Sequence, residues 1–227
     1  MSIFSTPGAL FDPLIALHIA AGFVGLLAGG AVMLLRKGDP RHRWIGRAFA
    51  LAMLTVAATA LGLASLRPNL FLLTIGLFTA YLTLTGWWAM AATRRGLARR
   101  AIARRDAMMA IPGMATSLAM LASAGLEAGV GEWNRVAVLG IFGLGLTATT
   151  GLDLRTAWAG GPSLMRRRAR HIQRMAGAWI ASLTAFAVVN LTMLPDPVVW
   201  LGPTVLVSPL VTYWTRRHAP EARGIIA

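Results

Sequence analysis

Residues 94–105 read RRGLARRAIARR, and no acidic residue interrupts them. This basic stretch separates an apolar run at about 69–92 from a second apolar run at about 106–126. Each run has about 20 residues, the length that an α-helix needs to cross the hydrocarbon core of a bilayer. The pattern predicts two transmembrane helices joined by an arginine-rich connection on one side of the membrane.

The same alternation of apolar run and short connection extends over the whole chain. It predicts an all-α fold, an integral membrane bundle of seven transmembrane helices that forms a single domain over residues 1–227. The predicted spans lie at about 12–35, 43–66, 69–92, 106–126, 134–154, 172–194 and 197–214.

The positive charge is distributed unevenly between the two sides of this predicted bundle. The connections after the first, third and fifth runs, and the segment after the seventh, hold nearly all the arginines. The opposite side holds only Arg67 and Arg135, together with acids such as Glu127 and Glu132. Cytoplasmic loops carry the excess of Lys and Arg in membrane proteins, so we expect the amino terminus outside and the carboxyl terminus in the cytoplasm.

Composition narrows the classes of function. The chain of 227 residues is 56% hydrophobic and 13% charged, with a net charge of +14 and no cysteine. Disulfides, iron–sulfur clusters and thiolate zinc sites are therefore excluded. The arginines interrupt apolar spans and do not form one basic face, which argues against nucleic acid as a partner. A basic inner surface instead attracts anionic lipid head groups, by about 1 kcal/mol per charge near the surface.

His18 is the most unusual ionisable residue, because it lies about six residues, or roughly 9 Å, inside the first predicted span. An ionisable group in hydrocarbon is costly and is a candidate functional residue for that reason. Two interpretations stay open. His18 belongs to a functional site, or it is a neutral imidazole bonded to a neighbouring helix, for example to Asn190 at a comparable depth.

His42 and His171 lie near the inner ends of the second and sixth predicted spans. With Asp39 and Asp153 at similar depth they could form a metal site, although their spacing has no ligand signature such as His-Glu-x-x-His. A haem held by two axial histidines needs both at one depth, so His18 does not pair with either of them. No cofactor is favoured, and haem or a divalent metal is the alternative.

Asp153 ends the fifth predicted span beside Arg155, which favours an ion pair at the membrane interface. A proton relay would need acids and histidines through the whole membrane, and the middle of the predicted bundle offers only Tyr81 and scattered threonines. The sequence therefore predicts no relay.

Several short motifs resemble those of a group of bacterial multi-pass membrane proteins known only as a domain of unknown function. They are LHIAAG at 17–22, RKG at 36–38, HRWIGR at 42–47, RPNLF at 67–71, LTGW at 84–87 and HIQRM at 171–175. The resemblance implies a location in the bacterial cytoplasmic (inner) membrane and no particular reaction. Together with the depth arguments, it singles out a set of candidate polar site residues: His18, His42, Arg47, Asp153, His171, Arg174 and Asn190.

These observations favour a non-enzymatic membrane protein, either a small transporter or an accessory factor. Its site would use polar residues of the first, second and sixth spans. The alternative is a histidine-dependent haem- or metal-binding redox protein. A homo-oligomer is compatible with the sequence, which contains helix-packing glycines such as Gly25 and Gly29.

Overall fold

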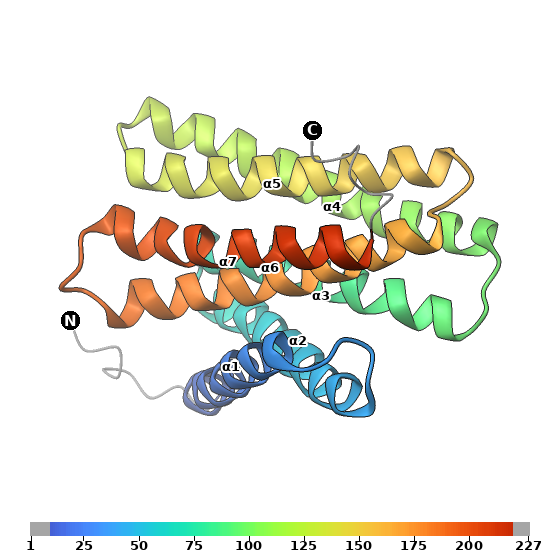
Figure 1. The fold of residues 1–227 in the computed structure, drawn as a ribbon. Coiled ribbons are helices and arrows are strands. Elements are labelled where there is room, and N and C mark those ends of the chain that lie inside the picture. Colours follow the sequence, from blue (N-terminus) through green and yellow to red (C-terminus); the bar gives the residue numbers. More distant parts are fainter. Residues whose placement is uncertain (1–9, 220–227) are drawn as a thin grey trace. The chain divides into compact units, whose positions relative to one another are not determined.

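A computed structural model describes residues 10–219, and all the regular secondary structure in this part of the chain is helical (Figure 1). Over these residues there are seven helices, joined by short connections. Their bounds are α1 Phe11–Leu34, α2 Pro40–Leu66, α3 Leu70–Arg94, α4 Arg99–Gly129, α5 Trp133–Trp158, α6 Leu164–Asn190 and α7 Asp196–His218.

All seven helices have the length and the apolar composition of membrane-spanning segments, so the prediction of an all-α, multi-pass membrane fold is confirmed. Large apolar side chains such as Leu34, Leu206 and Met193 are exposed on the protein surface. Lipid-facing positions of a membrane protein are apolar, which accounts for such exposure.

Two helices begin well before their apolar runs. Arginine has a good helix propensity, so α4 includes the basic residues from Arg99 to Arg105. Helix α6 begins at Leu164 because the Ser163 side chain accepts a hydrogen bond from the Arg166 N–H at 3.2 Å, which caps the helix. Both helices therefore carry charged residues in their first turns, next to the apolar stretch.

The chain divides into two compact units within α3, between Ala80 and Tyr81. In the first unit, α1 and α2 form an antiparallel hairpin. Glycine permits their close approach, since a Cβ added at Gly25 would lie 3.0 Å from the Met53 sulfur. This is the packing role that the sequence predicted for Gly25.

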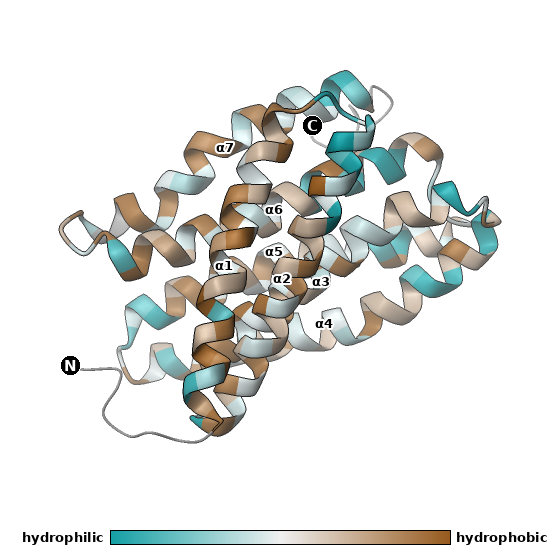
Figure 2. Ribbon diagram, turned by 90° about the horizontal axis from the view of Figure 1, so that it is seen from below, coloured by the Kyte–Doolittle hydropathy of each residue, from teal (hydrophilic) through white to brown (hydrophobic). Residues whose placement is uncertain are grey.

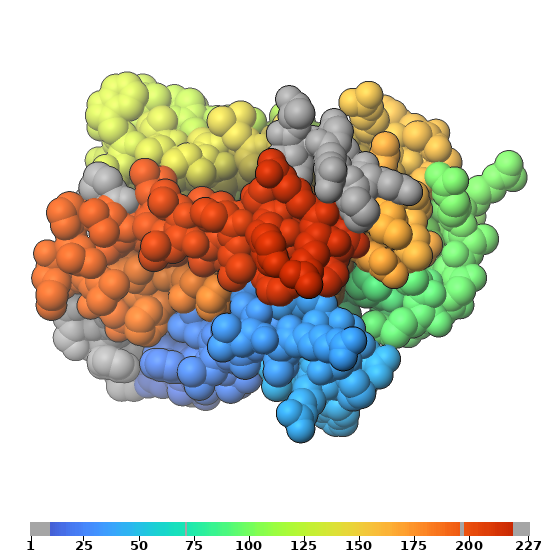
Figure 3. Space-filling view, in the orientation of Figure 1, coloured from blue at the N-terminus to red at the C-terminus, as the bar shows by residue number. Residues whose placement is uncertain are grey.

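The second unit contains the end of α3 and the helices α4 to α7. Helix α4 packs on α5, and α6 packs on α7, so that two hairpins lie along each other (Figure 1). The space-filling view shows α7 in red on the face of this unit toward the viewer and the α4–α5 hairpin in yellow-green along its rim (Figure 3).

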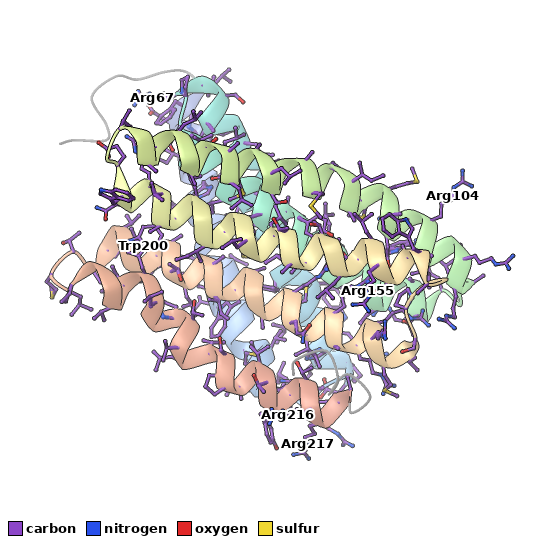
Figure 4. The ribbon with its side chains drawn as sticks, turned by 90° about the horizontal axis from the view of Figure 1, so that it is seen from above. Arg67, Arg104, Arg155, Trp200, Arg216 and Arg217 are labelled. Carbon is purple, nitrogen blue, oxygen red and sulfur yellow. The ribbon has the colours of Figure 1, made fainter. Side chains whose placement is uncertain are left out.

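Polar residues gather at the helix ends, whereas the middle stretches are mostly apolar or neutral (Figure 2). Within the second unit, Arg104, Arg155, Arg216 and Arg217 lie toward one end, and Trp200 lies toward the opposite end (Figure 4). We call the first of these the arginine end; there α3, α5 and α7 finish and α4 and α6 begin.

Candidate functional site: a buried charge network

Two carboxylates are buried inside the second unit. Asp106 lies on α4 and is 4% exposed, and Asp153 lies on α5 and is 2% exposed. An ionised carboxylate is expensive to remove from water unless it is paired and hydrogen-bonded. The structure must therefore supply cations to both of them.

Helix α6 provides these cations from one face. Arg170 and Arg174 are four residues apart, so their side chains lie on the same side of the helix. Arg170 bridges the two acids, because one of its Nη atoms pairs with Asp106 and the other lies 2.9 Å from Asp153 Oδ1. Arg174 Nη1 lies 2.7 Å from Asp153 Oδ2.

Helix α3 completes the network with neutral groups. The Tyr81 hydroxyl donates a hydrogen bond to Asp153 Oδ2 at 2.6 Å. Arg174 donates to the Thr85 hydroxyl at 2.5 Å and to the backbone carbonyl of Thr149 at 3.2 Å. The charge network thus joins α3, α4, α5 and α6 through six side chains: Tyr81, Thr85, Asp106, Asp153, Arg170 and Arg174.

Two glycines allow the helices to approach closely around this network. A Cβ added at Gly86 on α3 would lie 3.0 Å from the Cβ of Arg174, so glycine lets α3 meet α6 beside that arginine. A Cβ added at Gly113 on α4 would lie 2.8 Å from both the Tyr81 ring and the Thr150 side chain. Pro112, directly before Gly113, cannot donate the usual helical hydrogen bond.

The network is electrically balanced, with two negative and two positive groups, and it is buried between helices α3, α4, α5 and α6. Arg174 is ten residues from the start of α6 at Leu164, which corresponds to about 15 Å along that helix, and the arginine-rich first turns of α6 precede it. Neutralising one carboxylate would leave an excess positive charge in this low-dielectric interior. The arrangement can therefore couple proton binding to a rearrangement of helices.

The two carboxylates differ in how firmly they are held. Asp153 accepts a hydrogen bond from Tyr81 and is ion-paired with both Arg170 and Arg174. Asp106 is paired with Arg170, with which its Oδ2 atom is hydrogen-bonded. Hydrogen bonds to the charged form of a carboxylate favour that form. The ionised form of Asp106 is therefore held by fewer partners than that of Asp153.

The structure places three of the predicted site residues together. Asp153 and Arg174 are ion-paired, although the sequence favoured Arg155 as the partner of Asp153. His171 lies beside them on α6, and its Nδ1 is 2.9 Å from the backbone carbonyl of Gly86 on α3, which fixes Nδ1 as the donor.

Two further predicted residues have local partners. His18 Nδ1 lies 2.9 Å from the Thr59 hydroxyl on α2, within the first unit. That hydroxyl already donates to the carbonyl of Thr55 at 2.7 Å, so His18 Nδ1 is the donor in this bond. The Asn190 amide donates to the carbonyl of Phe186 on its own helix.

The remaining two predicted residues lie in the first turns of α2. The His42 backbone N–H is bonded to the Asp39 side chain, which caps the helix. Arg47 is exposed. That His42 and Arg47 belong to a functional site stays a prediction.

Sequence reasoning missed Asp106, Arg170, Tyr81 and Thr85 as members of a site. One available signal was the spacing of Arg170 and Arg174, which puts two cations on one helix face next to an apolar run. A second was Asp106, an acid that directly follows a stretch of twelve residues, 94–105, containing six arginines.

Among residues 10–219, no three His, Asp or Glu side chains converge in a way that could hold a metal ion. A haem or metal bound by one or two histidines stays a prediction. An absorption spectrum and a metal analysis of the purified protein would test it.

Compared with models of protein families, with curated proteins and with solved structures, the chain matches none. The resemblance noted from the sequence motifs therefore stays a prediction, and the functional argument depends on the geometry of the charge network.

Proposed function

We propose that this protein is a small transporter that moves protons across a bacterial cytoplasmic membrane. The observation that supports this proposal is the balanced charge network of two aspartates and two arginines inside the helices of the second unit. Ionisable residues within transmembrane segments are rare, and they mark ion pathways and proton relays.

In the proposed mechanism, Asp106 takes up the proton. Arg170 is shared between these two carboxylates. When Asp106 becomes neutral, the ion pair between α4 and α6 is lost and Arg170 pairs with Asp153 alone. Helix α4 is then released from α6, and Pro112 and Gly113 in the same helix provide a point at which it can bend.

Tyr81 extends the network toward the middle of the membrane. Its hydroxyl is bonded to Asp153, and its ring packs against Gly113. A rearrangement at Asp106 that moves α4 would therefore shift the contact of Gly113 with Tyr81. Tyr81 thus connects the carboxylate of Asp153 to helix α4, a connection that the sequence alone did not predict.

The proposal is tested by proton flux into liposomes that contain the purified protein and an enclosed pH-sensitive dye. With an inside-negative potassium diffusion potential, we expect wild-type protein to acidify the interior faster than protein-free liposomes do. Asp106→Asn should reduce the rate to that of protein-free liposomes, because an amide cannot carry the proton. Glu132→Gln, which removes a carboxylate from the α4–α5 connection, is the control and should leave the rate unchanged.

A wild-type rate equal to that of protein-free liposomes would refute proton transport. Full flux in folded Asp106→Asn protein would refute the role of Asp106. The thermal unfolding temperature of each variant in detergent separates these outcomes from a failure to fold.

We also propose that the arginine end faces the cytoplasm, on the strength of the positive-inside rule. The chain has no cysteine, so single cysteines can report on accessibility directly. In intact cells, a membrane-impermeant maleimide should label Glu132→Cys and should not label Leu97→Cys, which lies in the connection between α3 and α4. The opposite pattern would invert the proposed orientation.

A further inference from the structure

Two buried hydrogen-bond donors at the arginine end of the second unit have no acceptor among the described residues. They are the indole N–H of Trp88 on α3 and the Nη1 group of Arg105 on α4. They belong to one local structure, because the guanidinium carbon of Arg105 lies 3.3 Å from the centroid of the Trp88 ring. Buried donors in proteins nearly always have a partner, so this pair requires an explanation.

The surroundings of this pair are strongly positive. Arg95 also approaches the Trp88 ring, with its guanidinium carbon 5.6 Å from the centroid. The stretch 94–105 contains no acid. The next residue, Asp106, is paired with Arg170 inside the charge network. The Trp88–Arg105 site thus concentrates donors and positive charge, and within residues 10–219 no acceptor pairs with the Trp88 N–H or the Arg105 Nη1 group.

The start of α4 is held in place near this site. Arg99 Nη2 donates to the carbonyl of Gly161 in the α5–α6 connection at 2.6 Å, which ties the first turn of α4 to that connection. Arg105 lies six residues further along the same helix. Its guanidinium is therefore presented by a fixed helix and is additionally held by the stacking on Trp88.

We infer that the Trp88–Arg105 site binds the phosphate of an anionic phospholipid head group. A phosphate oxygen accepts hydrogen bonds from guanidinium and indole donors, and arginine is the preferred side chain for phosphate recognition. The site lies where the apolar runs of α3 and α4 give way to arginines, which is the level of the head groups. Tryptophan is enriched at this level, and basic pockets between transmembrane helices bind anionic head groups.

This site is distinct from a general attraction between a basic surface and anionic lipid. A general attraction depends on the number of charges, so Arg104 and Arg105 would contribute equally to lipid binding. The two arginines differ in environment, because Arg104 is exposed and Arg105 is partly buried over the Trp88 ring. The two neighbouring arginines provide a matched pair of variants with the same loss of charge.

The test measures lipid binding to the full chain in a neutral detergent by native mass spectrometry. Phosphatidylglycerol is titrated against phosphatidylcholine as the zwitterionic reference. We expect Arg105→Gln to weaken the preference for phosphatidylglycerol about tenfold, because the substitution removes the charged donor of the hydrogen bonds to the phosphate. Trp88→Phe keeps an aromatic ring and removes the N–H, and it should weaken the preference several-fold.

Arg104→Gln is the control and should change the preference by less than about twofold, as expected for an exposed charge. Equal losses in Arg104→Gln and Arg105→Gln would overturn the inference in favour of general surface electrostatics. If inorganic phosphate alone displaced phosphatidylglycerol from wild-type protein and not from Arg105→Gln, the ligand would be a free anion and the lipid assignment would be overturned. An unchanged unfolding temperature in phosphatidylcholine shows that each variant is folded.

Discussion

Replacing Asp153 with asparagine is expected to lower the free energy of unfolding by about 3–5 kcal/mol. The substitution conserves the shape of the side chain and removes its charge. Arg170 and Arg174 then share a single carboxylate, Asp106, to which only Arg170 is bonded. Breaking a buried ion pair by removing one partner is costly because the remaining charge has no compensation in the interior.

The measurement is equilibrium unfolding of the purified protein in mixed micelles, followed by circular dichroism. Glu127→Gln is the matched control, since it makes the same chemical change in an ion pair at the membrane surface. Arg135 and Glu127 are 3.4 Å apart, with side chains that are 66% and 19% exposed. Exposed pairs contribute about 0–1 kcal/mol, so the control should be nearly as stable as wild type.

A second variant distinguishes loss of charge balance from loss of packing. Asp153→Asn combined with Arg174→Gln removes one charge of each sign and restores neutrality. We expect the double variant to be more stable than the sum of the two single effects predicts, by about 0.5–3 kcal/mol, as contacting residues usually are coupled to this extent. Equal losses in Asp153→Asn and Glu127→Gln, or strict additivity in the double variant, would contradict the charge network.

The number and the approximate positions of the helices could be predicted because span length and apolar composition are local properties of the sequence. The first and last residues of each helix were harder to predict from the sequence. Arginines are good helix formers, so α4 and α6 continue beyond the apolar runs into the basic stretches. The predicted spans at 106–126 and 172–194 therefore put Asp106 and Arg170 at or outside the membrane boundary, where charge is ordinary.

The members of the charge network could be predicted only in part for the same reason. Asp153 was identified because it ends a predicted span, where an ionisable group is costly, and Arg174 was identified because it belongs to one of the motifs that carry the resemblance. Their pairing depends on which helix faces which, and this is tertiary information that a single sequence lacks. Likewise, the depth of His18 indicated an unusual residue, but the sequence offers many hydroxyl partners and did not indicate Thr59.

The connection between α5 and α6 gives the second large expected effect. Gly161 has φ +97°, and a Cβ added there would lie 2.5 Å from the backbone carbonyl oxygen of Arg99 on α4. Alanine is strained at this φ by about 1–2 kcal/mol. The contact with the Arg99 backbone adds roughly 1–3 kcal/mol, because relieving it would require one of the two backbone segments to shift. Gly161→Ala should therefore lower the free energy of unfolding by about 2–5 kcal/mol.

Gly160 provides the control for this prediction, since the two neighbouring glycines share the strain and differ in the contact. Gly160 has φ +84°, and a Cβ added there would meet no atom within 4 Å. Gly160→Ala should cost only the strain, about 1–2 kcal/mol in the same unfolding measurement. The difference between the two variants isolates the approach of the α5–α6 connection to Arg99. Because Arg99 also donates to the Gly161 carbonyl, Gly161→Ala should displace the start of α4, and equal losses in both variants would show that this approach does not exist.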